Sequence, residues 1–263
     1  MQRDLSEKIE ALLVRAGEIM LSARDMPLVT HEKGDAANLV TEYDLKVQSF
    51  LIGGIKELLP DAAFLAEEGE GCLDCLGKPL CFIIDPIDGT ANFVHGYRHS
   101  CISLAMLEHG KTQYGAVYDP YQGELFTATR GGGAYLNERP ISVSRTDMPH
   151  AIVTFGSSPY RKEELGEATF AIVKELFYAC SDIRRTGSAA LDLAYLAAGR
   201  TDAFLELTLS PWDYAAGQLL VEEAGGIVTD AGRKALSLSS PSSVVGATPD
   251  IYEQIIRIVE GHS

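Results

Sequence analysis

An apolar strand that ends in paired carboxylates constrains this chain more than any other feature. The apolar run that begins at Phe82 ends at Asp85, and Asp88 follows three residues later. A proline between the two acids and a glycine directly after them favour a sharp turn. Such a turn would let the two carboxylates and the backbone carbonyl of Ile87 converge on one point.

Oxygen atoms in this arrangement are the ligands that hard divalent cations prefer. The alternative is an ordinary acidic turn, because Asp, Pro and Gly are common in turns for local reasons. Two other acidic positions favour a metal site. Glu67 and Glu68 end the preceding predicted strand, and Asp213 begins a predicted helix, where the helix dipole alone would also favour an acid. Mg²⁺ leaves waters available for chemistry, and two ions together can assist phosphoryl transfer.

Composition excludes several classes of protein. Of the 263 residues, 46% are apolar and 22% are charged, which suits a globular chain with a large core. The formal net charge of -15 argues against nucleic acid as the main partner, because phosphate binding needs a basic face. No apolar run reaches the ~18 residues of a membrane helix, and the N-terminus lacks a signal peptide's apolar segment. We therefore expect a cytoplasmic protein without a membrane partner.

The cysteines predict free thiols. The chain has five, and an odd number without a signal peptide suits a reducing compartment. Cys72 and Cys75 have the CxxC spacing of zinc and redox sites, but neither a second CxxC nor a His pair accompanies them. Two ordinary loop cysteines are the favoured interpretation.

Apolar periodicity predicts helices over residues 7–23 and 42–59. Asp4 has capping-box spacing at the start of the first helix. Thr41 is the predicted N-cap of the second helix, with Asp44 in its first turn.

Beyond these helices the pattern changes twice. Short strands are expected at 62–68 and 79–85, and residues 100–145 read as strands joined by turns, with the glycine run 131–133 as one tight turn. From residue 150 onward strands and helices alternate. The predicted strands are 151–157, 201–207, 226–230 and 242–248, and the predicted helices are 163–179, 187–199, 212–224 and 250–259. This change predicts two subdomains, 1–145 and 146–263, in one compact unit with a layered α/β core.

Four stretches together resemble the inositol monophosphatase family in residues, order and spacing. They are FLAEEGE, FIIDPIDGTANFVHG, RRTGSAALDLAYLAAG and PWDYAAGQLLVEEAGG. The resemblance runs from the first predicted helix nearly to the C-terminus. It implies a layered αβαβα fold, Mg²⁺-dependent hydrolysis of small phosphate monoesters, a homodimer and, as in many members, inhibition by lithium.

The resemblance also implies two or three bound Mg²⁺ ions. Glu67, Asp85 and the Ile87 carbonyl match the ligands of the first ion. Asp85, Asp88 and Asp213 match the ligands of the second. A third, weaker ion would lie near Glu67.

The same resemblance implies a catalytic group around Thr90. This threonine and Glu67 match residues that orient and activate the attacking water, and Asp44 matches the acid that polarises the threonine. The backbone amides of Gly89 and Thr90 are suited to holding phosphate oxygens. Ala91 departs from the family pattern, in which a second hydroxyl is usual, so weaker phosphate contacts are expected.

Further matches lie on the alcohol side of the substrate, where Glu206 matches a glutamate that binds sugar hydroxyls. The residues implied on this side are Asp88, Gly187, Ser188, Ala189, Glu206 and Asp213, and together with Gly89 and Thr90 at the phosphate they make up the expected substrate-binding set. Lys33 matches a lysine of a mobile loop and is equally well explained as an exposed charge. A direct chemical role for His95 is not favoured, because a lone histidine is more often structural.

These features predict a phosphatase that hydrolyses inositol-1-phosphate to inositol and phosphate with water activated by the metal. Another small phosphate ester is the alternative substrate: a phosphorylated sugar such as fructose 1,6-bisphosphate, histidinol phosphate or a nucleotide 3′-phosphate. The core motif serves all of them, and specificity lies in loops that the motif does not fix. An alternative of another class is a regulatory binding protein that uses the same fold.

Overall fold

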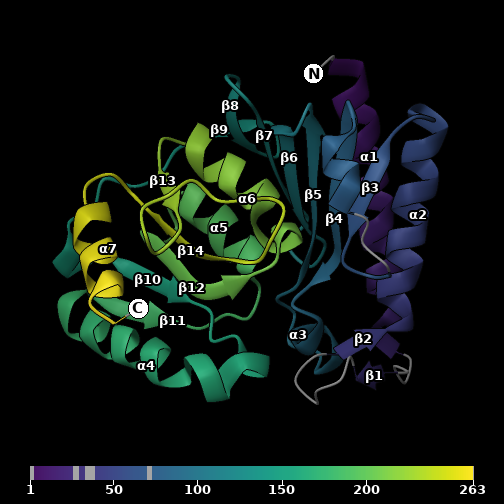
Figure 1. The fold of residues 1–263 in the computed structure, drawn as a ribbon. Helices are drawn as coiled ribbons and strands as arrows, with labels where there is room; N and C mark the ends of the chain where they lie inside the picture. The colour runs from purple at the N-terminus through teal and green to yellow at the C-terminus, as the bar shows by residue number, and fades with distance from the viewer. Residues whose placement is uncertain (1–2, 26–29, 33–38, 70–72, 263) are drawn as a thin grey trace.

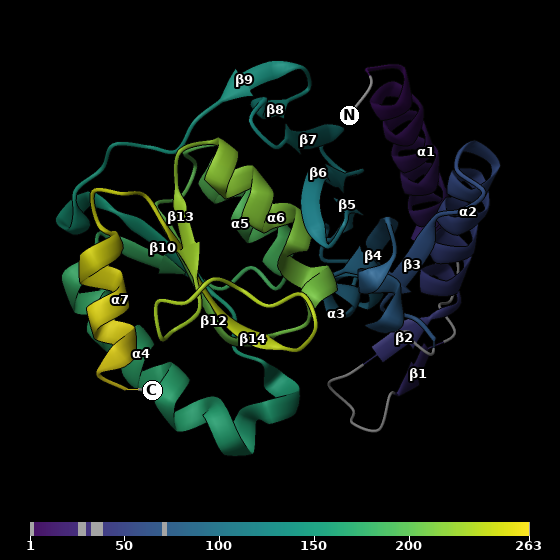
Figure 2. The same cartoon turned by 45° about the horizontal axis from the view of Figure 1, so that its top comes forward.

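Five layers of alternating helices and sheets make up the computed structural model, which describes residues 3–25, 30–32, 39–69 and 73–262. A seven-stranded and a five-stranded sheet lie face to face with a pair of helices between them, and a further helix pair covers each outer face (Figures 1 and 2). This arrangement confirms the predicted αβαβα fold class. In the described part of the chain, no helix is long and apolar enough to cross a bilayer.

The seven-stranded sheet has the order β3-β4-β5-β6-β7-β8-β9. Only β3 and β4 pair in parallel, and every other neighbouring pair is antiparallel. The strands are β3 (Ala63–Ala66), β4 (Leu80–Asp88), β5 (Cys101–Glu108), β6 (Lys111–Asp119), β7 (Glu124–Thr129), β8 (Gly133–Leu136) and β9 (Arg139–Ile141). Its outer face is covered by α1 (Arg3–Leu21) and α2 (Glu42–Leu58).

The five-stranded sheet has the order β11-β10-β12-β14-β13. The strands are β10 (Ile152–Phe155), β11 (Asp182–Arg184), β12 (Ala203–Leu209), β13 (Ile227–Thr229) and β14 (Ser242–Ala247). Helices α4 (Lys162–Ala179) and α7 (Tyr252–Glu260) cover its outer face. Helices α5 (Ala189–Ala197) and α6 (Pro211–Glu223) fill the space between the two sheets.

The remaining elements are short. Strands β1 (Thr30–Glu32) and β2 (Leu39–Thr41) form a two-stranded antiparallel sheet, and α3 (Thr90–Val94) follows β4. The 3₁₀ helices are η1 (Ser22–Asp25), η2 (Leu73–Gly77), η3 (Met148–His150) and η4 (Pro159–Arg161).

Strand β4 is buried on both faces, which explains its continuous apolar sequence. Cys81 and Ile83 pack with α5 and α6, whereas Phe82 and Ile84 pack with α1 and α2. The alternation of strand side chains continues this first face to Asp85 and so turns its carboxylate toward the inner helices.

The main difference from the predicted secondary structure lies at the end of β4. The strand was expected to end at Asp85, but it continues to Asp88 with a shift of register against β5 between these two residues. In such an irregularity one strand has an extra residue relative to its neighbour, and the side chains beyond that point change direction. Ile87 therefore returns to the α1 and α2 face, and Asp88 points into the site.

Two helix starts were predicted with different success. Thr41 is the N-cap of α2 with Asp44 in the first turn, as expected, and the two residues form a capping box. The capping prediction for Asp4 is wrong, because α1 already includes Arg3 and the Asp4 carboxylate accepts a hydrogen bond from Lys8 instead.

The glycine run 131–133 forms the predicted tight turn, between β7 and β8. The division into subdomains 1–145 and 146–263 remains a proposal.

Gly115 in β6 allows the sheet to pack directly on the backbone of α6. A Cβ atom at this position would lie 2.8 Å from the carbonyl oxygen of Ala216. Backbone cannot yield to this contact cheaply, so we expect Gly115→Ala to lower the free energy of unfolding by about 1–3 kcal/mol. Urea unfolding measures this change.

The matched control is Gly53→Ala in α2, where a Cβ atom would meet nothing within 4 Å. Because alanine is the better helix former, this variant should be as stable as the original chain or more stable by up to about 1 kcal/mol. Equal effects of the two substitutions would contradict the proposed close packing.

Candidate functional site

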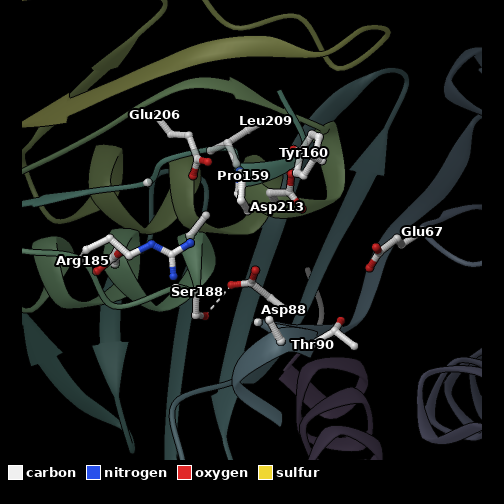
Figure 3. A pocket seen from close by; sticks show the side chains of 16 residues that line it. Glu67, Asp88, Thr90, Pro159, Tyr160, Arg185, Ser188, Glu206, Leu209 and Asp213 are labelled. Carbon is white, nitrogen blue, oxygen red and sulfur yellow. Dashed lines mark hydrogen bonds between the residues drawn. The ribbon is translucent and has the colours of Figure 1, made fainter. Parts of the chain in front are cut away.

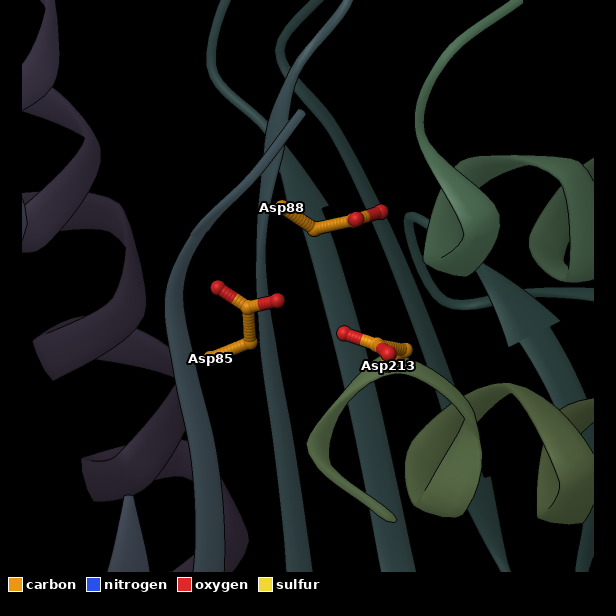
Figure 4. Close-up of side chains that lie close together, drawn as sticks. All are labelled: Asp85, Asp88 and Asp213. Atoms are coloured by element: carbon orange, nitrogen blue, oxygen red, sulfur yellow. The ribbon is translucent and has the colours of Figure 1, made fainter. Parts of the chain in front are cut away.

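Three aspartates from two layers of the fold meet at one point. Asp85 and Asp88 come from the irregular end of β4, and Asp213 comes from the first turn of α6. One carboxylate oxygen from each lies within 4.8 Å of the others, and Figure 4 shows the side chains directed toward a common centre. Residues 125 positions apart in the sequence thus form one acidic cluster, as the sequence predicted.

Hydrogen bonds fix one oxygen of each of these carboxylates. Asp85 Oδ1 accepts the N–H of Ile87 at 3.0 Å, which forms the expected turn. Asp88 Oδ2 accepts the N–H of Ala190 at 2.8 Å and also the hydroxyl of Ser188, the N-cap of α5. The N-terminus of α5 therefore holds Asp88 in place.

Asp213 has a structural and a site role at once. Its Oδ2 atom accepts the N–H of Ser210 at 2.7 Å and so completes the capping box of α6. Its position in the first turn of α6 also fits the alternative interpretation, an acid favoured by the helix dipole, but the same side chain belongs to the acidic cluster as well.

Burial raises the pKa values of the three aspartates, and their mutual repulsion adds to the effect. The pKa of Asp85 lies well above its usual range because of burial first and then the charges of Glu67, Asp88 and Asp213. Burial raises the pKa of Asp88 to about 6, although bonds from Ser188 and Ala190 oppose the rise. The pKa of Asp213 is raised well above normal by burial and then by Asp88 and Glu67.

Glu67 lies beside this cluster. It follows β3 directly, lines the same pocket, and its side chain is hydrogen-bonded with Asp85. The backbone of the next residue, Glu68, is anchored to α2, because Gln48 Oε1 accepts its N–H at 3.0 Å and Gln48 Nε2 donates to its carbonyl. This contact sets the position of the adjacent acidic pair at the strand end.

Thr90 forms the contact with Asp44 that the sequence led us to expect. Its hydroxyl lies 3.3 Å from Asp44 Oδ1 and 3.0 Å from the carbonyl oxygen of Ile87. Asp44 is buried and its other oxygen accepts both the N–H and the hydroxyl of Thr41. Burial raises the pKa of Asp44, and the Thr41 bonds oppose the rise. The capping box of α2 therefore also places an acid next to Thr90.

A pocket of about 150 Å³ extends from these acids toward the five-stranded sheet (Figure 3). The sequence-predicted residues that line it are Glu67, Asp88, Gly89, Thr90, Gly187, Ser188, Ala189, Glu206 and Asp213. Ala91, the departure from the family pattern, lines it as well. Asp44, Asp85 and Ile87 lie behind this lining and are buried.

Glu206 is held at the far end of the pocket. Its Oε1 atom accepts the N–H of Ser158 at 2.9 Å and the Ser158 hydroxyl at 2.7 Å. Its Oε2 atom lies over Gly156, where any Cβ atom would be only 1.7 Å away. Burial raises the pKa of Glu206 to about 7, while the Ser158 bonds and the charge of Arg185 lower it.

Sequence reasoning missed several residues that line the pocket. Arg185 reaches between Glu206 and Ser188 in Figure 3 and, among the described residues, is the one basic side chain that lines the pocket. Gly156, Tyr160 and Asp192 also line it. The arginine pair at 184–185, which Thr186 separates from Gly187, was a signal for Arg185, whereas nothing local marks Gly156 as the residue beneath Glu206.

Two other positions singled out in the sequence, Lys33 and Cys72, lie outside the described residues. Cys75 is buried and is not among the residues that line the pocket. His95 is exposed at the end of α3 and is not among the residues that line the pocket.

The donor set fits a divalent cation. The three carboxylates lie within 4.8 Å of one another, and Asp85 and Asp88 are buried. Among the described residues no buried basic side chain lies beside them to neutralise their like charges. A hard cation with oxygen ligands compensates such a cluster. These observations define a class of protein: a layered αβ fold whose buried acidic cluster is suited to divalent cations and lies beside a turn that carries a hydroxyl group.

Comparisons with known proteins place the chain in one family. The family model described as the inositol monophosphatase family matches residues 1–263. The chain therefore belongs to the inositol monophosphatase family.

Three relatives illustrate what the chain is similar to. It is 44% identical to Nus factor SuhB of Vibrio cholerae over 201 residues, which are 76% of this chain and 74% of that protein. An IMPase from Thermotoga maritima superposes with a TM-score of 0.89 at 33% identity and covers 99% of this chain and 98% of its own. SaIMPase-II of Staphylococcus aureus with inositol monophosphate bound has a TM-score of 0.82 at 28% identity, covering 98% and 95%.

The raised pKa values predict a pH-dependent response to Mg²⁺. Below its folded pKa of about 6, Asp88 is protonated and lowers the stability of the folded protein only slightly. At higher pH the ionised cluster destabilises the metal-free protein. The cation binds the ionised form, so its stabilising effect should grow as the pH rises from 5.5 to 8. At pH 8 we expect a rise in Tm of about 5–10 °C with Mg²⁺ in roughly 100-fold excess over its Kd.

Thermal denaturation at the two pH values, with and without Mg²⁺, measures this response. Asp213→Asn should remove most of the Mg²⁺ effect, whereas the exposed Asp61→Asn should not change it. A Mg²⁺ shift that is the same at both pH values would show that these carboxylates do not bind the ion.

Proposed function

We propose that this protein is a Mg²⁺-dependent phosphate monoester hydrolase and that its preferred substrate is inositol-1-phosphate. The observation that carries the proposal is the meeting of Asp85, Asp88 and Asp213 in a pocket that also holds Thr90 in contact with buried Asp44. Membership of the inositol monophosphatase family supports the phosphatase activity. The homodimer and lithium inhibition that the resemblance implies belong to the same proposal.

We assign two or three Mg²⁺ ions to the acidic end of the pocket. Their proposed ligands are Glu67, Asp85, the Ile87 carbonyl, Asp88 and Asp213. When bound, Mg²⁺ neutralises charge on the phosphate ester and makes water more acidic. The side chains supply oxygen atoms already fixed by hydrogen bonds to Ile87, Ala190 and Ser210, so little reorganisation is needed.

Thr90 is assigned to orient the attacking water. A hydroxyl has a single hydrogen, and both Asp44 and the Ile87 carbonyl are in reach to accept it. The remaining lone pair of Thr90 Oγ1 is then an acceptor, so a water near it donates one hydrogen to the threonine. Glu67, which lies on the same side of the pocket as Thr90 in Figure 3, is assigned to accept the other proton. The amides of Gly89 and Thr90 are assigned to the phosphate oxygens.

The alcohol part of the substrate is assigned to the other end of the pocket. Glu206, held by Ser158, is assigned to bind a hydroxyl group of the substrate, and Ser188 and Ala189 line the same pocket. The relative from Staphylococcus aureus with inositol monophosphate bound supports a phosphorylated polyol as substrate. Fructose 1,6-bisphosphate, histidinol phosphate and a nucleotide 3′-phosphate are the competing esters.

A second candidate function is that of a regulatory binding protein. The observation that favours it is the name of the curated relative, Nus factor SuhB, which shares 44% identity with this chain. The two functions need not share residues, because the acidic pocket serves hydrolysis whereas a partner would contact a surface. A role that survives Asp88→Asn would therefore be separate from hydrolysis.

Asp88→Asn keeps the size of the side chain but removes a ligand charge, so hydrolysis of every ester should fall by about a thousandfold or more. Initial rates with Mg²⁺ over a panel of the four esters measure this loss, and a retained Tm shows that the variant is folded. Inositol-1-phosphate should have the highest kcat/KM in the original chain. A much higher value for another ester would overturn the substrate assignment, and no activity with any of them would overturn the enzyme assignment.

Thr90 offers a second test through matched substitutions. Thr90→Ser retains the hydroxyl that contacts Asp44 and should keep kcat within about tenfold, whereas Thr90→Val retains the shape and should lower kcat by about 100-fold or more. Steady-state kinetics at saturating Mg²⁺ separate these outcomes. Equal activity of the two variants would show that the hydroxyl has no part in the reaction.

A further inference from the structure

Asn92 lies outside the pocket lining but connects both ends of the site. It belongs to α3, two residues after Thr90, and its Nδ2 atom donates to the carbonyl oxygen of Thr186 at 2.9 Å. The same Nδ2 atom donates to the carbonyl oxygen of His99 at 2.7 Å. One side chain thus joins α3 to the turn before β5 and to the segment that leads into α5.

The chemistry of these contacts requires a side chain that donates two hydrogen bonds. Both partners are carbonyl oxygens, so the position needs an NH₂ group with two hydrogens and fixes which way the amide of Asn92 points. An aspartate of the same shape would direct an oxygen at two carbonyl oxygens and repel both.

The backbones around this carboxamide are in close contact. Gly89 has a φ of 88°, and a Cβ atom there would lie 3.1 Å from the carbonyl oxygens of both His99 and Gly187. Gly187 has a φ of 95°, and a Cβ atom there would lie 2.9 Å from Asn92 Nδ2. The turn assigned to the phosphate therefore rests directly on the turn assigned to the alcohol, with Asn92 at their junction.

The segment that Asn92 holds also carries the supports of the acidic cluster. Thr186 donates its hydroxyl to buried Asp192 at 2.8 Å, and Ser188 and Ala190 bond to Asp88. A shift of the Thr186 backbone would move the donors that fix Asp88 as well as the wall of the pocket.

We infer that Asn92 is a positioning residue that locks residues 186–190 onto α3 and so sets the spacing between the phosphate end and the alcohol end of the site. The consequence for catalysis rests on the proposed function, whereas the consequence for the backbone does not. Two readouts are therefore used, and the first needs no substrate.

The first readout is hydrogen–deuterium exchange of the full chain. Asn92→Ala should raise exchange about tenfold across residues 186–190, including the Ala190 amide that bonds to Asp88, with little change in Tm. The matched control is Asn137→Ala, which removes an asparagine that donates to a backbone carbonyl in a turn far from the pocket. It should leave exchange of residues 186–190 unchanged. Unchanged exchange in Asn92→Ala would overturn the inference.

The second readout is kinetic. Asn92→Ala should raise KM for inositol-1-phosphate by about tenfold with a smaller change in kcat, and should alter KM for p-nitrophenyl phosphate by about twofold or less, because that ester lacks a polyol to align. Equal losses with both esters would indicate a general structural role and contradict the proposed positioning.

Asn92→Asp separates hydrogen bonding from space filling. If the carboxamide acts through its donors, this variant should be more impaired than Asn92→Ala, whereas a packing role would make it nearly normal. A normal Asn92→Asp would overturn the inference. If the original chain hydrolyses none of the esters, the proposed function fails, while the exchange experiment still decides the role of Asn92.

Discussion

The repulsion among buried carboxylates is the constraint on which the rest of this structure depends. Asp85, Asp88 and Asp213 come within 4.8 Å of one another in a part of the protein where burial alone raises their pKa values. An arrangement of this kind is unfavourable unless each acid is held in place and a positive charge compensates the cluster. The surrounding elements supply the first condition, and a hard cation would supply the second.

The supports of the cluster come from separate layers, so the site exists only when the layers are assembled. The irregular end of β4 directs two of the acids inward, the N-terminus of α5 binds Asp88, and the capping box of α6 orients Asp213. A further capping box, at the start of α2, places Asp44 beside Thr90. Residues at the ends of helices and strands thus stabilise the fold and also position the site. A substitution at Asp44 or Asp213 is therefore expected to affect both stability and the site.

Sequence reasoning succeeded where one local pattern decides the outcome. Thr41 and Asp44 have the spacing of a capping box, and the apolar run before Asp85 marks a buried strand, so both were predictable. The continuation of β4 to Asp88 was not, because an irregular strand pairing depends on the neighbouring strand rather than on the residues themselves. Arg185, Gly156 and Asn92 were missed for a related reason. Their roles arise from contacts with segments remote in the sequence, such as the Asn92 bond to Thr186, and no period or spacing encodes such a contact.

Charge connects the pocket to the substrate that we propose. A phosphate monoester is an anion, and the described residues that line the pocket include five carboxylates and one arginine. In the absence of cations this lining repels the ester, so under the proposed function the acids at the Asp88 end must be neutralised before the phosphate is held there. At the other end, burial raises the pKa of Glu206 to about 7 and the charge of Arg185 opposes the rise, so neither sign of charge dominates there near neutral pH. A carboxyl group in this state can accept or donate a hydrogen bond, which suits the hydroxyl groups of a polyol. Under the proposed function, charge therefore selects at the phosphate end, whereas hydrogen bonding selects at the alcohol end.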